Sequence, residues 1–383
     1  MNICMLAYTF YEYDNRVMRC AEALVKRGDH VDVISLKKEG QSNYTVYKGV
    51  NIYRIQKRRP EERTGKVFYL IRINRFLIRS FCILMLKNIK KRYDFVHVHS
   101  PPDYEIFAAW ITKITGAKLI LDIHDIVPEF YLSKFKVPND LFVYKFLVLI
   151  EKISIKFAHH VIVSNHMWQK KLLSRSVNRD KCTVILNYPD PTIFYPRPVT
   201  KNHNKFLMIY PGTISYHQGL DIAIEAVSLV KDRLTDAELH IYGAGTEKIT
   251  LKRLIKEKRL ENCVFINGLL PLDEIAQVMA NSDLGIVPKR SDSFGNEAFS
   301  TKILEFMALG VPVLVSDTEI DRFYFSENLV KFFKSGDVHD MAENILLLYQ
   351  NKGLRKYLSK TSLEYVEQNN WEVKKAEYLQ LIT

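Results

Sequence analysis

The sequence lacks the cysteine and glycine patterns that define several common protein classes. Its 383 residues include five cysteines, and no two of them form a Cys-x-x-Cys pair. An odd, scattered set argues against a disulfide framework and against a zinc site, and it predicts reduced thiols in a cytoplasmic protein. A dinucleotide fingerprint is also missing, because Gly243-Ala244-Gly245 has no third glycine and opens the wrong structural unit. An NAD-dependent dehydrogenase is therefore poorly supported.

Targeting and membrane-spanning signals are missing as well. The N-terminus has no basic segment and no small-residue cleavage site, so we expect no signal peptide and predict a β-strand over residues 2–7 instead. The longest apolar stretch, residues 67–86, is interrupted by Arg72, Arg75 and Arg79. Three arginines in mid-span argue against a transmembrane helix.

Positive charge is abundant, and it is concentrated in one segment. The formal net charge is +12, and between Lys57 and Arg92 twelve Lys or Arg residues stand against two Glu, a net of +10. A surplus held in one segment indicates a local anionic partner. No recognised nucleic-acid motif is present, so nucleic acid is not the expected partner.

The spacing of three arginines in this segment indicates what kind of anionic partner is expected. Arg72, Arg75 and Arg79 are three and four residues apart, so they form one stripe along a helix whose remaining face is apolar. Such a helix fits the interface of an anionic membrane, where each nearby basic residue contributes about 1 kcal/mol. We predict that these arginines contact a membrane surface. An ordinary helix packed on a sheet is the alternative.

The order of the predicted elements indicates two α/β halves. A strand over residues 2–7, a helix capped by Asp14 and a second strand form a β-α-β unit, and the same pattern restarts with a strand over residues 206–210. A proline-rich stretch between the halves is the most credible linker. The predicted divisions are an N-terminal domain over 1–190, a linker over 191–204, a C-terminal domain over 205–365 and a helix over 366–383.

The stretch over residues 296–316 predicts a loop, a helix, a stop and a buried strand. Ser300 is the expected N-cap of this helix, and Gly310 suits the left-handed position just past its end. The free amides of the first turn carry a partial positive charge, which suits a phosphate. Lys302, in the same turn, adds a full charge.

Two glutamates, Glu297 and Glu305, lie eight positions apart around this turn and precede a Gly-x-Pro-Val strand. The pattern resembles the signature of the family-4 retaining glycosyltransferases, which have the GT-B fold. The resemblance implies an α/β protein of two Rossmann-like domains that face each other across a cleft, with the last helix crossing back to the N-terminal domain. By position, it makes Glu297 the residue that approaches the donor sugar and Glu305 the one that holds the ribose hydroxyls.

The resemblance also implies a binding site for a nucleotide-sugar donor in the C-terminal half. Gly212, Thr213, Gly243 and Gly245 lie on turns that follow strands. Glycine turns let backbone amides approach a phosphate. We therefore expect these four residues to contact the nucleotide sugar.

The donor diphosphate needs cations, and here the sequence departs from the family. Many members have an Arg and a Lys in the first C-terminal turn, where this chain has Thr213 and Gln218. The cations expected in their place are Lys289, Arg290 and Lys302. No Asp-x-Asp pair is present, so a metal-independent reaction is predicted, with a helix N-terminus and these side chains in the role of Mg²⁺.

Histidines follow strands in the N-terminal half. One strand ends at His99, and another is followed by His124 and Asp125. The carboxyl ends of strands in open α/β sheets border the ligand crevice. The resemblance places His124 near the donor sugar and makes His99 and Asp125 acceptor-side residues. Arg16, at the start of the first helix, either touches a phosphate or acceptor group or is solvated, and His97 is expected to pack behind the sheet.

The leading hypothesis is a retaining glycosyltransferase with Glu297, His124 and Lys302 as catalytic residues. It would move a sugar from a nucleotide donor to a lipid-linked or glycan acceptor at the inner face of the cell membrane, without a cofactor or metal. A nucleotide-sugar 2-epimerase has the same architecture, and it would convert the donor without an acceptor. A non-catalytic partner of another transferase also stays open, because of Thr213 and Gln218.

Overall fold

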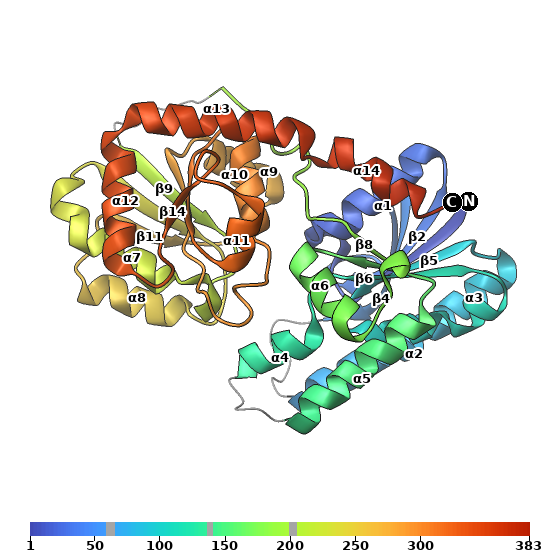
Figure 1. The fold of residues 1–383 in the computed structure, drawn as a ribbon. Coiled ribbons are helices and arrows are strands. Elements are labelled where there is room, and N and C mark those ends of the chain that lie inside the picture. The colour runs from blue at the N-terminus through green and yellow to red at the C-terminus, as the bar shows by residue number, and fades with distance from the viewer. Residues whose placement is uncertain (59–65, 136–140, 199–204) are drawn as a thin grey trace. The chain divides into compact units, whose positions relative to one another are not determined.

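The computed structural model describes residues 1–58, 66–135, 141–198 and 205–383 (Figure 1). Contacts divide the chain into two compact units. The first contains Met1–Asn187 and Lys375–Thr383, and the second contains Tyr188–Lys374. Each unit has one predominantly parallel sheet with helices packed on it, as the two predicted α/β halves require. Residues 199–204 of the predicted linker lie outside the described residues.

The first unit is built on an eight-stranded sheet of order β3-β4-β2-β1-β5-β6-β7-β8. All neighbours pair in parallel except β3 and β4, which form an antiparallel edge. After β1 the chain adds β2, β4 and β3 toward one edge of the sheet, and after β5 it adds β6, β7 and β8 toward the other edge. The strand order therefore reverses between the neighbours β1 and β5. The strands are β1 (Asn2–Ala7), β2 (His30–Lys37), β3 (Tyr44–Tyr47), β4 (Val50–Lys57), β5 (Phe95–Ser100), β6 (Lys118–Ile123), β7 (His160–Val163) and β8 (Cys182–Val184).

Local chemistry places the first helix of this unit as predicted. Asp14 caps α1, because its carboxylate accepts a hydrogen bond from the amide of Val17 at 3.2 Å. Gly28 ends the helix with φ 98°, a left-handed conformation that glycine adopts without strain. The helices of this unit are α1 (Asn15–Arg27), α2 (Lys66–Lys90), α3 (Trp110–Ile114), α4 (Val127–Phe135), α5 (Leu141–Phe157) and α6 (His166–Arg175), with a 3₁₀ segment η2 (Asp103–Ala109).

The second unit has a six-stranded, fully parallel sheet of order β11-β10-β9-β12-β13-β14. Its order reverses between β9 and β12. The strands are β9 (Phe206–Pro211), β10 (Ala237–Tyr242), β11 (Val264–Asn267), β12 (Leu284–Val287), β13 (Val313–Ser316) and β14 (Lys331–Phe333). Apolar side chains from both faces of this sheet form two buried clusters with the covering helices. The helices are α7 (Leu220–Val230), α8 (Lys248–Glu257), α9 (Leu272–Ala280), α10 (Thr301–Ala308), α11 (Glu319–Tyr324), α12 (Val338–Gln350) and α13 (Lys352–Gln368).

Helix α10 begins and ends where the sequence predicts, with one difference at its start. Gly310 adopts φ 72° just beyond the helix, as expected. Ser300 occupies the N-cap position, but its hydroxyl does not accept a hydrogen bond from the first turn. The Ser300 Oγ instead lies 3.4 Å from the Nζ of Lys302. The prediction of a capping hydroxyl is therefore wrong, because a neighbouring ammonium is its hydrogen-bond donor.

The C-terminal run predicted as one helix consists of two. Helix α13 ends at Gln368 and α14 (Trp371–Gln380) begins after a short break. From Lys375 onward the chain belongs to the first unit. Arg27 of α1 holds this end, because its Nη1 donates to the carbonyls of Leu379 and Ile382 at 2.9 and 2.8 Å. Among the described helices, none combines the length and the apolarity that crossing a bilayer requires.

Candidate active site

Two glycine turns pack against each other at the carboxyl edge of the second sheet. Gly212 follows β9 with φ 137°, and Gly243 follows the neighbouring β10 with φ 159°. A Cβ on Gly243 would lie 1.8 Å from the carbonyl oxygen of Gly212, and one on Gly245 would lie 2.0 Å from that of Ile214. The Gly212 amide donates to the Tyr242 carbonyl at 2.8 Å. These glycines therefore allow backbone to pack on backbone, and the Gly212 amide is already engaged.

Lys302 extends from the first turn of α10 to the turn after β9. A Cβ on Gly212 would lie 3.3 Å from its Cε. The Lys302 Nζ lies 3.4 Å from Gln218 Oε1 and 5.2 Å from the ring centre of Tyr210. Gln218 Oε1 also accepts from the Tyr210 hydroxyl at 3.0 Å. Gln218, which stands where the family usually has a Lys, therefore orients an ammonium group that comes from α10.

The surroundings of Lys302 change its acidity. Burial lowers the pKa of the ammonium group to about 8, although the carboxylate of Glu305 acts in the opposite direction. Lys302 forms no ion pair with a carboxylate in the described residues. Its charge is therefore not neutralised by a direct contact, and burial makes that charge unfavourable until an anion arrives.

The other two predicted cations are neutralised within the protein. Buried Lys289 forms an ion pair with Asp321 at 2.9 Å. Arg290 donates to the carboxylate of Asp221, and its guanidinium lies 4.3 Å from the ring centre of Tyr216. Of the three candidates, Lys302 is the cation left for a bound phosphate.

Lys289 instead fixes the loop that carries Glu297. Its Nζ donates to the carbonyl of Ala298 at 2.8 Å. Farther along the same loop, Asp292 Oδ1 accepts from the amide of Gly295 at 2.7 Å. These contacts tie the loop down on both sides of the half-buried Glu297. Lys289 thus acts on the predicted site through the loop.

The strand order shows where a ligand is expected in this unit. Gly212 follows β9, and the segment after β12 carries Glu297, Lys302 and half-buried Glu305. The order of the sheet reverses between these two strands. Ligands of open α/β sheets bind outside the carboxyl ends of the strands at such a point. One unpaired cation and two carboxylates therefore belong to the segments that border this binding position.

A buried ion pair closes the carboxyl edge of the first sheet. Arg16 of α1 and Asp122 of β6 meet through two hydrogen bonds of 2.7 Å each, with side chains 3% and 1% exposed. Arg16 Nη1 also donates to the Ile185 carbonyl at 2.7 Å and to Asn187 Oδ1 at 3.1 Å. Burial alone would raise the pKa of Asp122, but Arg16 outweighs it and holds that pKa well below its usual value. The alternative of a solvated Arg16 is therefore wrong, because the side chain is buried and all three guanidinium nitrogens donate within the unit. Contact of Arg16 with a ligand stays a prediction.

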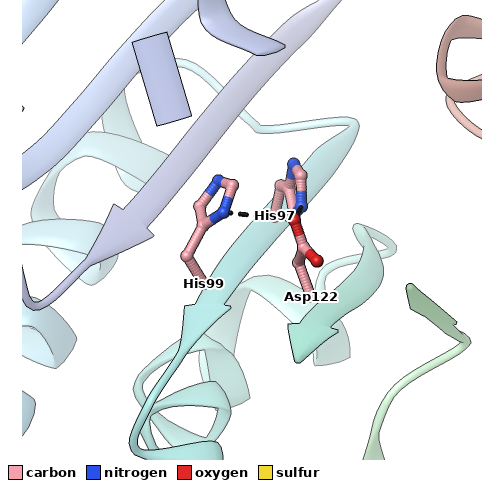
Figure 2. A group of neighbouring side chains, drawn as sticks. All are labelled: His97, His99 and Asp122. Atoms are coloured by element: carbon pink, nitrogen blue, oxygen red, sulfur yellow. Dashed lines mark ion pairs between the residues drawn. The ribbon is translucent and has the colours of Figure 1, made fainter. Parts of the chain in front are cut away.

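Three histidines surround the same carboxylate. His97 Nε2, His99 Nδ1 and His124 Nε2 lie 3.5, 3.4 and 3.5 Å from Asp122 Oδ2. Figure 2 shows His97 and His99 on β5 beside Asp122. His97, which is expected to pack behind the sheet, is fully buried, but it lies on the same face as His99, because residues two apart on a strand share a face.

The histidines differ in charge and access. Burial lowers the pKa of His97 and, more strongly, the pKa of His99, so both rings are neutral beside the ionised carboxylate. His124 is 18% exposed, and its Nε2 lies 3.1 Å from His99 Nδ1. The Nδ1 of His124 is therefore the nitrogen that can meet a ligand. Asp125, next in the chain, is half-buried, and burial raises the pKa of its carboxyl group.

The group His97, His99 and Asp122 has the spacing of a metal site, with three ligand atoms within 4.8 Å of one another (Figure 2). Its chemistry does not fit a metal. Both oxygens of Asp122 already accept from Arg16. A metal ion would have to displace this guanidinium or share a buried site with it, and an uncompensated buried charge is costly. Metal-independent catalysis stays a prediction.

The C-terminal segment contacts this cluster through Tyr378. The buried Tyr378 hydroxyl lies 3.0 Å from His97 Nδ1. The rings of His97 and His99 are 4.1 Å apart, and His99 contacts His124. A continuous set of contacts thus runs from α14 to the partly exposed histidine.

The predicted membrane helix forms α2, and two of its arginines contact the sheet. Arg75 Nε donates to Gln56 Oε1 at 3.1 Å, and Arg79 Nη1 donates to the Ile55 carbonyl at 2.9 Å. Arg72 is partly buried. The helix also has exposed apolar side chains, namely Phe68, Tyr69, Leu70, Ile71, Ile78, Leu86 and Ile89. Sheet packing and an exposed apolar face therefore coexist, and membrane contact stays a prediction.

Two α/β units, each built on a predominantly parallel sheet of this topology, are the architecture of the GT-B glycosyltransferases. The model of the family "Glycosyl transferase 4-like domain" matches residues 13–187, and that of "Glycosyl transferases group 1" matches residues 192–364. The chain belongs to the group 1 glycosyltransferases. The resemblance predicted from Glu297 and Glu305 is confirmed at the level of family and fold.

Individual proteins give the extent of the similarity. The amylovoran biosynthesis glycosyltransferase AmsK of Erwinia amylovora is 27% identical over 154 residues, which are 40% of this chain and 38% of that protein. The match thus spans less than two fifths of this relative. Sucrose-phosphate synthase from Thermosynechococcus elongatus superposes with a TM-score of 0.79 at 17% identity, covering 100% and 98% of the two chains. Anabaena HepE in complex with UDP-glucose gives 0.73 at 14% identity, with 99% of each chain covered.

Sequence reasoning missed the residues at the centre of the N-terminal cluster. Asp122 was not singled out, although a carboxylate within the apolar run of β6 was a usable signal, because a buried charge needs a partner. Tyr378 and Asn187 were missed because their partners are distant in the sequence. Gln218 was read as the loss of a cation, and its contact with Lys302 had no local signal.

Proposed function

We propose that this protein transfers a sugar, with retention of anomeric configuration, from a nucleotide-sugar donor to a glycan or lipid-linked acceptor held at a membrane surface. The donor occupies the second unit, and the acceptor approaches the histidine cluster of the first. The proposal gives the enzyme no metal requirement. It places the protein at the inner face of the cell membrane.

The observation that carries the proposal is the unpaired, half-buried Lys302 at the β9/β12 reversal. A departing nucleoside diphosphate gains negative charge as the glycosidic bond breaks. A preorganised cation in a poorly hydrated position stabilises that charge strongly. Lys302 and the first amides of α10 supply this stabilisation, and burial, which lowers the pKa of Lys302, favours the arrival of an anion that offsets its charge.

The remaining site residues take roles that follow from their chemistry and from the family pattern. Glu305 accepts hydrogen bonds from the ribose hydroxyls, and Glu297 faces the donor sugar. His124 offers Nδ1 to the sugar or the acceptor, since its other ring nitrogen is directed at His99. The leaving phosphate takes the proton of the attacking acceptor hydroxyl, so no separate nucleophile is required.

Two neighbours support the donor and acceptor classes. HepE, which shares the fold, binds UDP-glucose. AmsK is named an amylovoran biosynthesis glycosyltransferase. We therefore expect a nucleotide-sugar donor here and an acceptor that belongs to a growing glycan.

A thermal-shift panel of UDP-, GDP- and other nucleotide sugars, run in EDTA, tests the donor. A ligand at about 100 times its Kd adds about 2.7 kcal/mol of apparent stability. The best donor should then be consumed only when an acceptor extract is present, and NMR of the product should give the same anomeric configuration as the donor. Conversion of the donor alone would identify the epimerase instead. Unchanged function of Glu297→Ala and Lys302→Ala in cells would favour the non-catalytic partner.

A further inference from the structure

Helix α5 turns an apolar stripe toward solvent. Phe142 exposes 79% of its surface, and Phe146, Leu149 and Ile153 are also exposed. These residues recur three and four positions apart, so they line one side of the helix. In water such a stripe is unfavourable, and its length over most of α5 marks it as a contact surface.

The opposite side of α5 is anchored in the first unit. Buried Glu151 accepts from Arg175 Nε at 2.8 Å and from Arg175 Nη2 at 2.5 Å. The same guanidinium donates to Glu129 of α4 at 2.6 Å and to the hydroxyl of Tyr144 at 2.9 Å. This network fixes the rotation of α5, so the apolar stripe cannot turn inward without breaking buried ion pairs.

A row of lysines runs along one edge of the stripe. Lys145, Lys152 and Lys156 are exposed, and none of them has an ion-pair partner within the part of the chain that the structure describes. The acidic residue of this helix, Glu151, is buried and already paired with Arg175. The outward side of α5 therefore combines apolar side chains with positive charge that no described side chain of the unit pairs.

The same surface continues past the end of α5. The ring of Phe157 lies 6.4 Å from the ring of Trp110 on α3, and Trp110 is 56% exposed. Ile114, one turn later, is exposed as well. Tryptophan prefers the boundary between lipid headgroups and acyl chains. We call the exposed residues of this surface, Phe142, Lys145, Phe146, Leu149, Lys152, Ile153, Lys156, Trp110 and Ile114, the α5 face.

We propose that the α5 face binds the surface of an anionic lipid bilayer, with the apolar stripe in the headgroup region and the lysines on lipid phosphates. Charge complementarity decides the occupant, because an amphipathic helix with lysines beside its apolar stripe is typical of interfacial binding. The inference rests on the membrane-held acceptor of the proposed function and names the surface that holds the enzyme there. It also shifts the main contact away from Arg75 and Arg79 of α2, whose guanidinium groups donate to β4.

Vesicle sedimentation of the full chain tests the proposal. Wild type should bind vesicles with about one third phosphatidylglycerol, bind phosphatidylcholine vesicles much less, and lose binding at high salt. Lys145→Gln with Lys152→Gln and Lys156→Gln should weaken binding by more than tenfold, since each lysine near an anionic surface is worth about a fivefold change. Phe146→Ser with Leu149→Ser should weaken it on both kinds of vesicle.

Control variants come from α8 of the second unit, which also has exposed lysines and an exposed apolar residue. Lys252→Gln with Lys256→Gln, and Ile249→Ser at a position 83% exposed, should leave binding unchanged. Arg75→Ala with Arg79→Ala should weaken binding less than the α5 lysine variant. All variants should keep the thermal shift produced by the donor, so a failure of vesicle binding is separable from a failure of the proposed function.

Three results would overturn the assignment. One is wild-type protein that stays in the supernatant when anionic vesicles are sedimented. Another is α5 variants that bind these vesicles as tightly as wild type. A concentration-dependent dimer that Phe146→Ser with Leu149→Ser dissociates would instead assign the face to a second copy of the chain.

Discussion

The two units place their charged residues at equivalent edges of similar sheets but use them in opposite ways. In the first unit, Arg16 and Asp122 neutralise each other in a buried ion pair. In the second, Lys302 is half-buried and has no ion-pair partner among the described residues. The first arrangement contributes to the stability of the folded unit, whereas the second is unfavourable until an anion binds. The comparison indicates that the donor diphosphate belongs to the second unit, and that mutations in the two units should affect different measurements.

The largest expected effect is on stability, from the N-terminal ion pair. Asp122→Asn leaves Arg16 buried without its counter-charge, and breaking such a pair typically costs about 3–5 kcal/mol. Urea denaturation should report this loss, and Asp180→Asn at an exposed position should not. Because the folded pKa of Asp122 lies below the unfolded one, its stabilisation is complete at neutral pH and is lost as the pH falls through the folded pKa. An unchanged free energy of unfolding would mean that the pair does not stabilise the unit.

The next effect is on catalysis, with little change in stability. Lys302→Ala should lower kcat by about 100-fold or more, roughly 3 kcal/mol of transition-state stabilisation. Its folding free energy should be unchanged or slightly higher, because folding disfavours the charged ammonium. Steady-state kinetics and urea denaturation of the same preparation separate the two effects. A Lys302→Ala protein that is destabilised and fully active would reverse the comparison between the units.

The titration of Lys302 should appear in the pH dependence of kcat/KM for the donor. The pKa of about 8 means that the free enzyme carries this charge below that pH and loses it above. We expect kcat/KM for the donor to fall as the pH rises through about 8. Arginine stays charged throughout this range, so Lys302→Arg should move the falling limb to higher pH. If kcat/KM fell at the same pH in wild type and in Lys302→Arg, the titrating group would be a residue other than Lys302.

The smallest effect concerns the link between the C-terminal segment and the histidines. Tyr378→Phe removes one buried hydrogen bond to His97, and the expected loss of folding free energy is about 1 kcal/mol. Tyr357→Phe, at an exposed position, is the matched control. Donor-induced thermal shifts should be equal in both variants, since the proposed donor site belongs to the other unit. A weaker shift in Tyr378→Phe alone would show that the two units are coupled.

Local patterns were enough to predict the elements and the family. The carboxylate of Asp14, the left-handed Gly28 and the spacing of Glu297 and Glu305 each act within a few residues of the chain, so they can be read from the sequence.

The parts that could not be predicted depend on contacts between distant residues. Arg16 and Asp122 are 106 positions apart, and Tyr378 is 281 positions from His97. Lys289 and Lys302 look alike in the sequence, and only the position of Asp321 in the fold separates a neutralised cation from an unpaired one. The Ser300 hydroxyl accepts a hydrogen bond from the ammonium group of Lys302 and none from the helix amides. Sequence spacing does not show which of these two donors is used.

Isothermal titration calorimetry in EDTA tests the central claim most directly. Wild type and Lys302→Ala would each be titrated with the nucleoside diphosphate of the best donor and with the corresponding nucleoside. We predict that wild type binds the diphosphate at least about 100-fold more tightly than the nucleoside, and that this preference collapses in Lys302→Ala while nucleoside affinity is unchanged. An equal preference in both proteins would contradict the assignment of Lys302 as the cation that holds the diphosphate.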